Sequence, residues 1–84
     1  MFINKSLDGK NNLCGQKITL LRKQLHLSQR ALADQLQLLG LDLDKNAIQR
    51  IESGQRFVTD IELSVFCKFF HISADLLLTI EYTN

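Results

Sequence analysis

Four long polar side chains lie close together in the middle of the chain, and their chemistry suits hydrogen bonding to nucleic-acid bases. They are Lys45, Asn46, Gln49 and Arg50. Asparagine can form two hydrogen bonds with adenine, and arginine or lysine can address guanine O6 and N7. A helix that turned these side chains outward could read base edges in the major groove of DNA. The alternative is an ordinary solvated face, because surface helices are polar on their outer side.

A helix at this position needs a start, an end and an apolar face, and the sequence provides all three. Asp44, with Asp42 as a competitor, can accept a hydrogen bond as the N-cap. Ile48 and Ile51 recur at i, i+3 and should point inward. Gly54 follows the last turn, where glycine readily adopts a left-handed conformation. We therefore predict a short helix that turns the polar cluster toward solvent.

Apolar spacing and capping residues predict four further helices. Ser28 is a good N-cap, and Thr59 with Glu62 has the pattern of a capping box. His26 and His71 each follow a helix, where a left-handed residue is tolerated. The four expected helices cover residues 16–25, 29–36 with an apolar pattern that continues to 39, 60–70 and 74–78.

The composition favours one small all-α domain. The chain has 84 residues, of which 45% are hydrophobic, and it contains no proline. Strand-forming residues are sparse, so helices are the natural expectation. A turn-rich segment predicts a flexible N-terminal arm over residues 1–14, ahead of the domain at 15–78. Residues 79–84 are expected to form a tail.

Charge is unevenly distributed along the chain. Residues 1–58 carry nine Lys/Arg and five Asp/Glu, whereas residues 59–84 carry one and four. This polarity would orient the molecule on a polyanion. Cys14 and Cys67 form no CxxC motif, and neither a signal peptide nor a membrane-spanning stretch is evident. We therefore expect reduced thiols in a cytoplasmic protein without a membrane partner.

Several motifs together resemble the lambda-repressor-like, XRE-type helix-turn-helix family. They include Gly15-Gln16-Lys17-Ile18, Leu27-Ser28-Gln29, Ile51-Glu52-Ser53-Gly54 and Ile72-Ser73. Leu-Ser-Gln alone is weak, but the combination is specific and covers about residues 15–78. The resemblance implies a five-helix domain that binds double-stranded DNA in a sequence-specific way, often as a homodimer. It also implies a transcriptional regulator, by family habit a repressor, that acts by occupying its operator.

The resemblance assigns roles to individual residues. Base reading is implied for Lys45, Asn46 and Arg50, with Gln49 less firmly placed. Phosphate contacts are implied at the start of the second helix and after the third, for Ser28, Gln29, Ser53, Gln55 and Arg56. Finally, it implies a partly buried salt bridge between Arg22 and Glu52 that joins the first helix to the third.

The chain departs from the family pattern between the second and third helices. The step from Leu36 to Ile48 is longer than the family's tight turn, and the additional residues lie within 37–44. Either the second helix extends by a turn or the connection becomes a loop. The insertion also brings Asp42 and Asp44 near the expected phosphates, which is unfavourable unless they cap the third helix.

Metal binding and catalysis find little support. Cys14, His26, Cys67 and His71 complete a Cys2His2 count, but their spacing fits no common zinc motif. The sequence contains no glycine-rich phosphate loop and no nucleophile motif. We therefore predict a protein that is not an enzyme and uses neither a metal nor another cofactor.

The main alternative is a protein-interaction module, such as an antitoxin or a regulator controlled by a partner. Ile61, Val65 and Phe69 recur at i, i+4 and i+8 on the fourth helix. If exposed, they form an apolar patch for a homodimer or another protein partner. Otherwise other apolar residues of the chain cover them, either from the arm or from the insertion: Phe2, Ile3, Leu38, Leu39 and Leu41.

Overall fold

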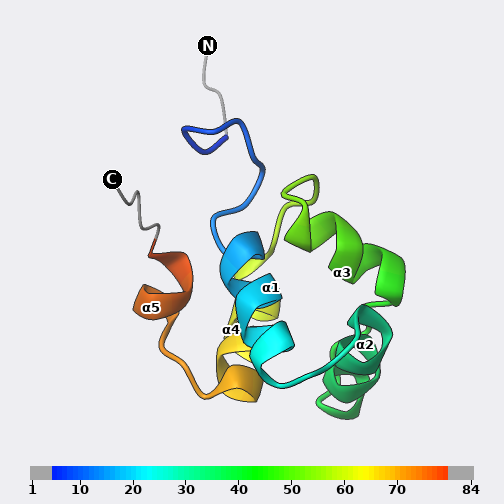
Figure 1. Ribbon diagram of the computed structural model, residues 1–84. Helices are drawn as coiled ribbons and strands as arrows, with labels where there is room; N and C mark the ends of the chain where they lie inside the picture. Colours follow the sequence, from blue (N-terminus) through cyan, green and yellow to red (C-terminus); the bar gives the residue numbers. More distant parts are fainter. Residues whose placement is uncertain (1–4, 80–84) are drawn as a thin grey trace.

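The computed structural model describes residues 5–79, which form five α-helices and no β-strand (Figure 1). The helices are α1 (Gly15–Gln24), α2 (Gln29–Leu38), α3 (Lys45–Glu52), α4 (Asp60–Phe70) and α5 (Ala74–Leu78). The predicted all-α, five-helix fold is confirmed, with boundaries that agree to within a residue or two. Most of the predicted tail lies outside the described residues. No helix within residues 5–79 has both the length and the apolar content needed to cross a membrane.

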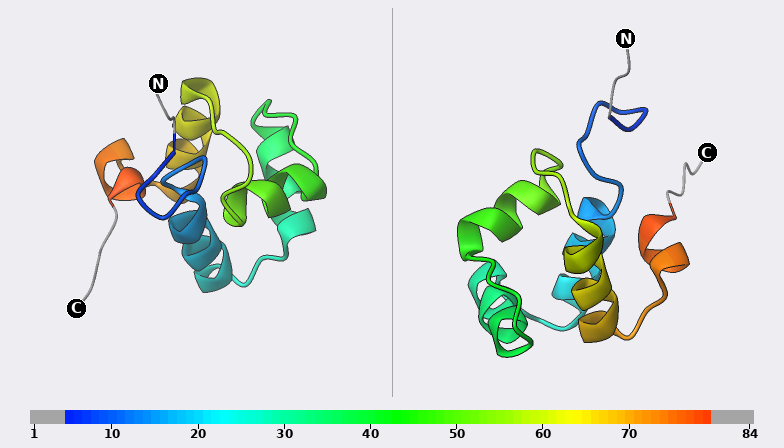
Figure 2. Two further views of the ribbon diagram at one scale, coloured as in Figure 1. Left: turned by 90° about the horizontal axis from the view of Figure 1, so that it is seen from above. Right: turned by 180° about the vertical axis from the view of Figure 1, so that it is seen from behind.

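The helices surround a shared core, with α2 and α3 on one side of the molecule and α5 on the other (Figures 1 and 2). α2 packs directly against α3. α1 contacts both α3 and α5, while α4 contacts both α2 and α5. The α2–α3 pair therefore rests on a framework made by the other three helices.

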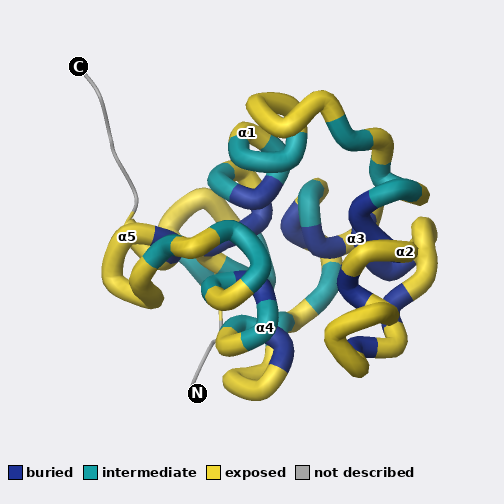
Figure 3. Tube along the Cα trace, turned by 90° about the horizontal axis from the view of Figure 1, so that it is seen from below, coloured by how far each residue is buried: buried dark blue, intermediate teal, exposed yellow. Residues whose placement is uncertain are grey.

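All five helices contribute side chains to the core, and Figure 3 colours the buried residues dark blue along the trace. The largest fully buried side chains are Phe66, Ile18, Leu32, Leu36, Ile48, Ile51, Leu77 and Cys14. Burying one large aliphatic or aromatic side chain stabilises a fold by about 1.5–3 kcal/mol. Phe70 extends the core, because its ring lies 6.5 Å from that of Phe66 and meets Phe69 edge-on at 5.0 Å.

Side-chain caps define where four of the helices begin. Ser28, Asp44 and Ser73 each accept a hydrogen bond from the backbone N–H three residues further on. Thr59 and Glu62 form the predicted capping box at the start of α4. Each cap satisfies one of the backbone donors that a helix leaves without a partner at its N-terminus.

A left-handed residue ends α1, α2 and α3 in the same way. His26, Gly40 and Gly54 have positive φ angles of 58°, 89° and 82°. The residue after each of them donates its N–H to the carbonyl five residues earlier, as in Leu41 to Leu36 at 3.0 Å. This Schellman arrangement reverses the chain and satisfies the last helical carbonyls. The prediction that His26 tolerates a left-handed conformation is confirmed.

The inserted residues divide between a longer α2 and a loop. α2 continues to Leu38, and residues 39–44 connect it to α3. Leu41 and Leu43 are buried in the core, whereas Leu38 remains 81% exposed. Because two leucines of the loop are buried, the connection is held against the domain by the hydrophobic effect.

Part of the segment predicted as an N-terminal arm contacts the helical domain. Residues 1–4 of the predicted arm lie outside the described residues, but Asn11 and Asn12 form hydrogen bonds with the end of α3 and with the segment that follows it. Cys14 is 1% exposed and belongs to the core. Asn11 and Asn12 are therefore attached to the domain through backbone carbonyls that the sequence pattern could not identify, and the boundary at residue 15 stays a prediction.

Gly15 allows α1 to approach the end of α3 closely. A Cβ atom at this position would lie 2.3 Å from the carbonyl oxygen of Ile51 and 2.9 Å from the side-chain oxygen of Asn12. Any larger residue would push the two helices apart. This glycine thus fixes the distance between the framework and the helix that carries the polar cluster.

Candidate nucleic-acid interface

The outer face of α3 carries the four polar side chains identified in the sequence. All four are exposed: Lys45, Asn46, Gln49 and Arg50. Ala47, Ile48 and Ile51 occupy the opposite face and are buried. Since the buried residues recur at helical spacing, core packing determines which face of α3 meets solvent.

Asp44, which carries a negative charge near this face, is the N-cap residue of α3. Its Oδ1 accepts a hydrogen bond from the Ala47 N–H at 2.8 Å. The carboxylate therefore lies at the positive end of the α3 dipole, where it is stabilised. Asp42, the competing cap in the sequence, is exposed and does not cap the helix.

Glu52, the last residue of α3, forms the predicted ion pair with Arg22 of α1. Arg22 donates from Nε to Glu52 Oε2 at 2.7 Å and from Nη2 to Oε1 at 3.0 Å. Its Nη1 donates to the Leu27 carbonyl at 2.8 Å. Only 11% of the Arg22 side chain and 7% of the Glu52 side chain are exposed. These hydrogen bonds with Glu52 raise the pKa of Arg22, which favours the charged guanidinium.

The start of α2 is attached to the same carboxylate. Gln29 Nε2 donates to Glu52 Oε1 at 3.1 Å, which orients the glutamine side chain that the resemblance assigns to phosphate contact. Ser28 is exposed, and its hydroxyl accepts the cap hydrogen bond from the Ala31 N–H at 3.0 Å. Both residues thus lie at a helix N-terminus, which is a favourable place for an anion.

The segment after α3 presents Ser53 and Gln55 to solvent. The Ser53 hydroxyl donates to the Arg50 carbonyl at 3.1 Å, and the Gln55 N–H donates to the same carbonyl at 2.9 Å. The left-handed Gly54 between them produces this reversal of the chain. Both residues follow the end of α3 at which Gln29 is bonded to Glu52.

Arg56 has a partner that the sequence analysis did not anticipate. Its guanidinium forms two hydrogen bonds of 2.9 Å with Glu62, one to each carboxylate oxygen. A third goes to the Phe57 carbonyl at 3.0 Å. The hydrogen bond with Glu62 raises the pKa of Arg56, and the hydrogen bond with Arg56 lowers the pKa of Glu62. Arg56 therefore joins the segment after α3 to the α4 cap, and its phosphate contact stays a prediction.

Two asparagines that the sequence analysis left out also reach this segment. Asn11 and Asn12 bond to backbone carbonyls more than thirty residues away in the chain. The sequence signal was only a turn-rich stretch, and asparagine is common in any turn. Neither partner could be deduced from local spacing.

The apolar residues of α4 are only partly available as a surface. Ile61 is 71% exposed, while Val65 and Phe69 are partly buried and pack against the core. Leu38 and Leu39 are themselves exposed, so they give this face little cover. Two of the other residues proposed as cover, Phe2 and Ile3, lie outside the described residues.

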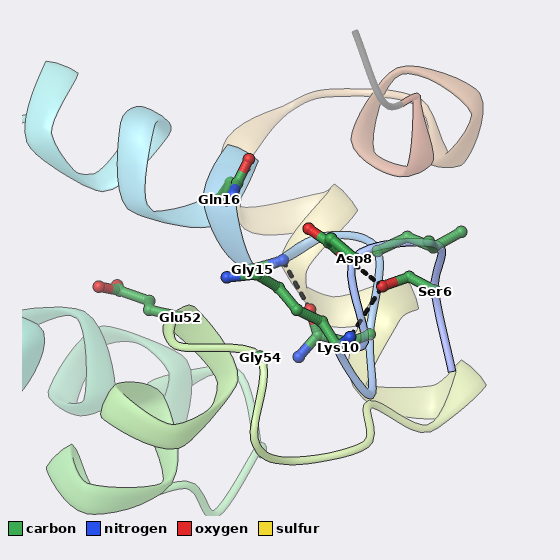
Figure 4. Close-up of a pocket in the computed structure, with 9 residues that line it drawn as sticks. Ser6, Asp8, Lys10, Gly15, Gln16, Glu52 and Gly54 are labelled. Carbon is green, nitrogen blue, oxygen red and sulfur yellow. Dashed lines mark hydrogen bonds between the residues drawn. The ribbon is translucent and has the colours of Figure 1, made fainter. Parts of the chain in front are cut away.

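One hollow beside the end of α3 is small. A hollow of about 30 Å³ lies beside Glu52 and Gly54, with Lys10 and Gly15 in its wall (Figure 4). This is room for about one water molecule. Cys14 and Cys67 are free, and burial raises the pKa of the Cys14 thiol to about 11. Within residues 5–79 no three or more His, Cys, Asp or Glu side chains gather as metal ligands would.

Comparison with known proteins gives one finding. The model of a family described as Helix-turn-helix matches residues 18–77, which is most of the chain. The match runs from α1 into α5 and contains α2, α3 and α4 in full. Comparisons with curated proteins and with solved structures found no match.

Replacing Glu52 should test how much the domain depends on the buried pair. We expect Glu52→Ala to lower the free energy of unfolding by about 3–5 kcal/mol, because Arg22 would remain buried without its partner. Chemical denaturation followed by circular dichroism measures the change. Asp34→Ala, at an exposed position of α2, is the control and should have little effect. A cost below about 1 kcal/mol for Glu52→Ala, as for a surface pair, would contradict this role.

The ion pair between Arg56 and Glu62 predicts that the stability of the fold depends on pH. Because Arg56 lowers the pKa of Glu62 in the folded state, the pair stabilises the fold above the ordinary glutamate pKa of 4.5. That contribution should disappear as the pH falls through the lowered pKa. Glu62→Gln keeps a side chain able to accept in the capping box, and we expect it to reduce the loss of stability between about pH 6 and pH 3. Arg56→Met should act in the same direction, and a wild-type pH profile in both variants would refute the assignment.

Proposed function

The chain belongs to the Cro/CI-type helix-turn-helix family, and from this premise we propose that it represses transcription by occupying a specific operator in double-stranded DNA. The family is one of DNA-binding transcription regulators. The operator mechanism, the repressing direction and the residues that carry them are our proposal.

One observation carries the proposal, namely the exposed polar face of α3. Lys45 and Asn46 lie in its first turn, and Gln49 and Arg50 follow one turn later on the same face. Their side chains can hydrogen-bond to base edges in a major groove. Ile48 and Ile51 hold the other face of α3 in the core. The helix could therefore enter a groove only with its polar face toward the bases.

The residues on either side of α3 would set its depth and register. Ser28 and Gln29 offer a hydroxyl, an amide and the N-terminus of α2 to one phosphate strand. Ser53 and Gln55 offer polar side chains to the other. Contacts of this kind orient a protein on DNA without reading its sequence. Repression would follow from occupancy, because a bound protein excludes others from the same site.

A protein interface is the second part of the proposal. Ile61 is 71% exposed at the start of α4, and Val65 and Phe69 continue the same face. Exposed apolar side chains of this size favour association. We therefore propose a homodimer that contacts itself around Ile61, and a partner protein could use the same surface to control the regulator.

Selection of bound duplexes from a random pool should test base reading. We expect the wild-type protein to enrich one motif, while Asn46→Ala and Arg50→Ala each weaken binding to it by roughly 5- to 150-fold, equal to about 1–3 kcal/mol. Lys68→Ala removes a charge from the last turn of α4 and should leave the motif and the affinity nearly unchanged. Enrichment of no motif by a folded protein would refute sequence-specific binding.

Sedimentation velocity should test the proposed dimer. We expect the wild-type protein to sediment as a dimer at micromolar concentration and Ile61→Glu to sediment as a monomer, because a buried unpaired carboxylate is costly. Leu38→Glu is a matched control, since Leu38 is also highly exposed but lies on α2. A wild-type monomer, or a dimer unaffected by Ile61→Glu, would exclude this interface.

A further inference from the structure

Four hydrogen bonds join the segment before α1 to the end of α3 and to the segment that follows it. Asn11 donates from its backbone N–H to the Gly54 carbonyl at 2.8 Å and from Nδ2 to the Gln55 carbonyl at 2.9 Å. Asn12 Nδ2 donates to the carbonyls of Ile51 at 3.0 Å and Arg56 at 2.8 Å. The two asparagines thus bind carbonyls on both sides of Gly54.

Asn12 also determines where this connection sits on the domain. Its Oδ1 accepts a hydrogen bond from the Gly15 N–H at 2.8 Å, at the first residue of α1 (Figure 4). One side chain therefore joins the start of α1 to the end of α3. The carbonyls near a helix C-terminus need partners, and here the N-terminal segment supplies them.

This attachment brings two lysines to the segment around Gly54. Lys5 Nζ donates to Asn11 Oδ1 at 2.9 Å. The aliphatic stem of Lys10 lies against Gly54, where an added Cβ would be 2.7 Å from the lysine Cδ (Figure 4). Lys5, Lys10, Asn11 and Asn12 line an open hollow of about 190 Å³ on this side of the molecule.

The local charge around this hollow is positive. Asp8 is the acidic residue of the segment, and its carboxylate accepts a hydrogen bond from the Ser6 hydroxyl. Glu52, the nearby acid of α3, is already paired with Arg22. Lys5 and Lys10 therefore add two ammonium groups beside the segment after α3, and Asp8, which interacts electrostatically with Lys10, offsets only part of this charge.

We propose that residues 5–12 form an accessory contact with the phosphate backbone of the bound duplex. Lys5 and Lys10 make the contact, and Asn11 and Asn12 are positioning residues that hold the lysines against the segment after α3. This inference rests on the proposed function and extends it. The contact raises affinity for any duplex and leaves the choice of sequence to α3.

The salt dependence of binding provides the test. Each phosphate that a lysine neutralises steepens the plot of log affinity against log salt concentration by about 0.9 for duplex DNA. The double variant Lys5→Gln, Lys10→Gln keeps both stems and removes both charges. We expect the slope to become shallower by about 2, and affinity at low salt to fall at least several-fold, with the same selected motif. Lys68→Gln is the charge-matched control, at the end of α4 that Figure 1 shows far from the N-terminal segment.

The variant Asn11→Ala should show whether Asn11 positions the two lysines or only stabilises the fold. Both lysines remain in this variant, so a shallower slope in a protein that is still folded by circular dichroism would show that Asn11 places them. A slope equal to that of the wild type would refute positioning by Asn11.

Titrations on both a selected duplex and an unrelated duplex keep this inference distinct from the proposed function. If the wild type selects no motif but the double lysine variant still loses slope on any duplex, base reading fails and the accessory contact holds. If the motif is selected and the double variant matches Lys68→Gln, the accessory contact is wrong and base reading stands. Absence of binding to any duplex would overturn both.

Discussion

The position of the polar face depends on one buried carboxylate. Glu52 ends α3 and binds Arg22 of α1 and Gln29 of α2, while Arg22 also binds the Leu27 carbonyl in the link between those helices. Apolar packing alone tolerates small shifts of one helix along another, but hydrogen bonds to a charged group depend on distance and direction. With Gly15 setting the spacing between α1 and α3, this network specifies how the two helices of the motif are oriented relative to each other.

The fold could be predicted from the sequence because most of its signals are local. Caps such as Ser28 and Thr59 act within three residues, and the apolar spacing of each helix identifies its buried face. The conformation of the connection between α2 and α3 was harder to predict, since a longer helix and a longer loop are both compatible with the same apolar pattern in the sequence. Burial of Leu41 and Leu43 decides between them, and that depends on the core into which the loop folds.

The candidate site was predictable only where its residues project from a regular element. The exposed face of α3 follows from the helix and its apolar residues, and the Arg22–Glu52 pair followed from resemblance to a family. Asn12 and Arg56 could not be assigned, because their partners are set by how distant segments meet. An asparagine in a turn-rich stretch and an arginine after a helix each have many possible partners, and tertiary structure selects one.

Pairing of charges explains how a chain with a net charge of only +1 could bind a polyanion. In the described part of the chain, Arg22 and Arg56 are each held by a glutamate, so their charges are largely cancelled at short range. Asp44 is likewise compensated by the N-terminus of α3. Lys45 and Arg50 remain exposed on α3 itself, and Lys5 and Lys10 lie beside the segment that follows it. The local field therefore differs in sign and strength from what the total charge indicates. Binding to DNA would then depend on a few cations at defined positions, which makes the placement of each one important for affinity.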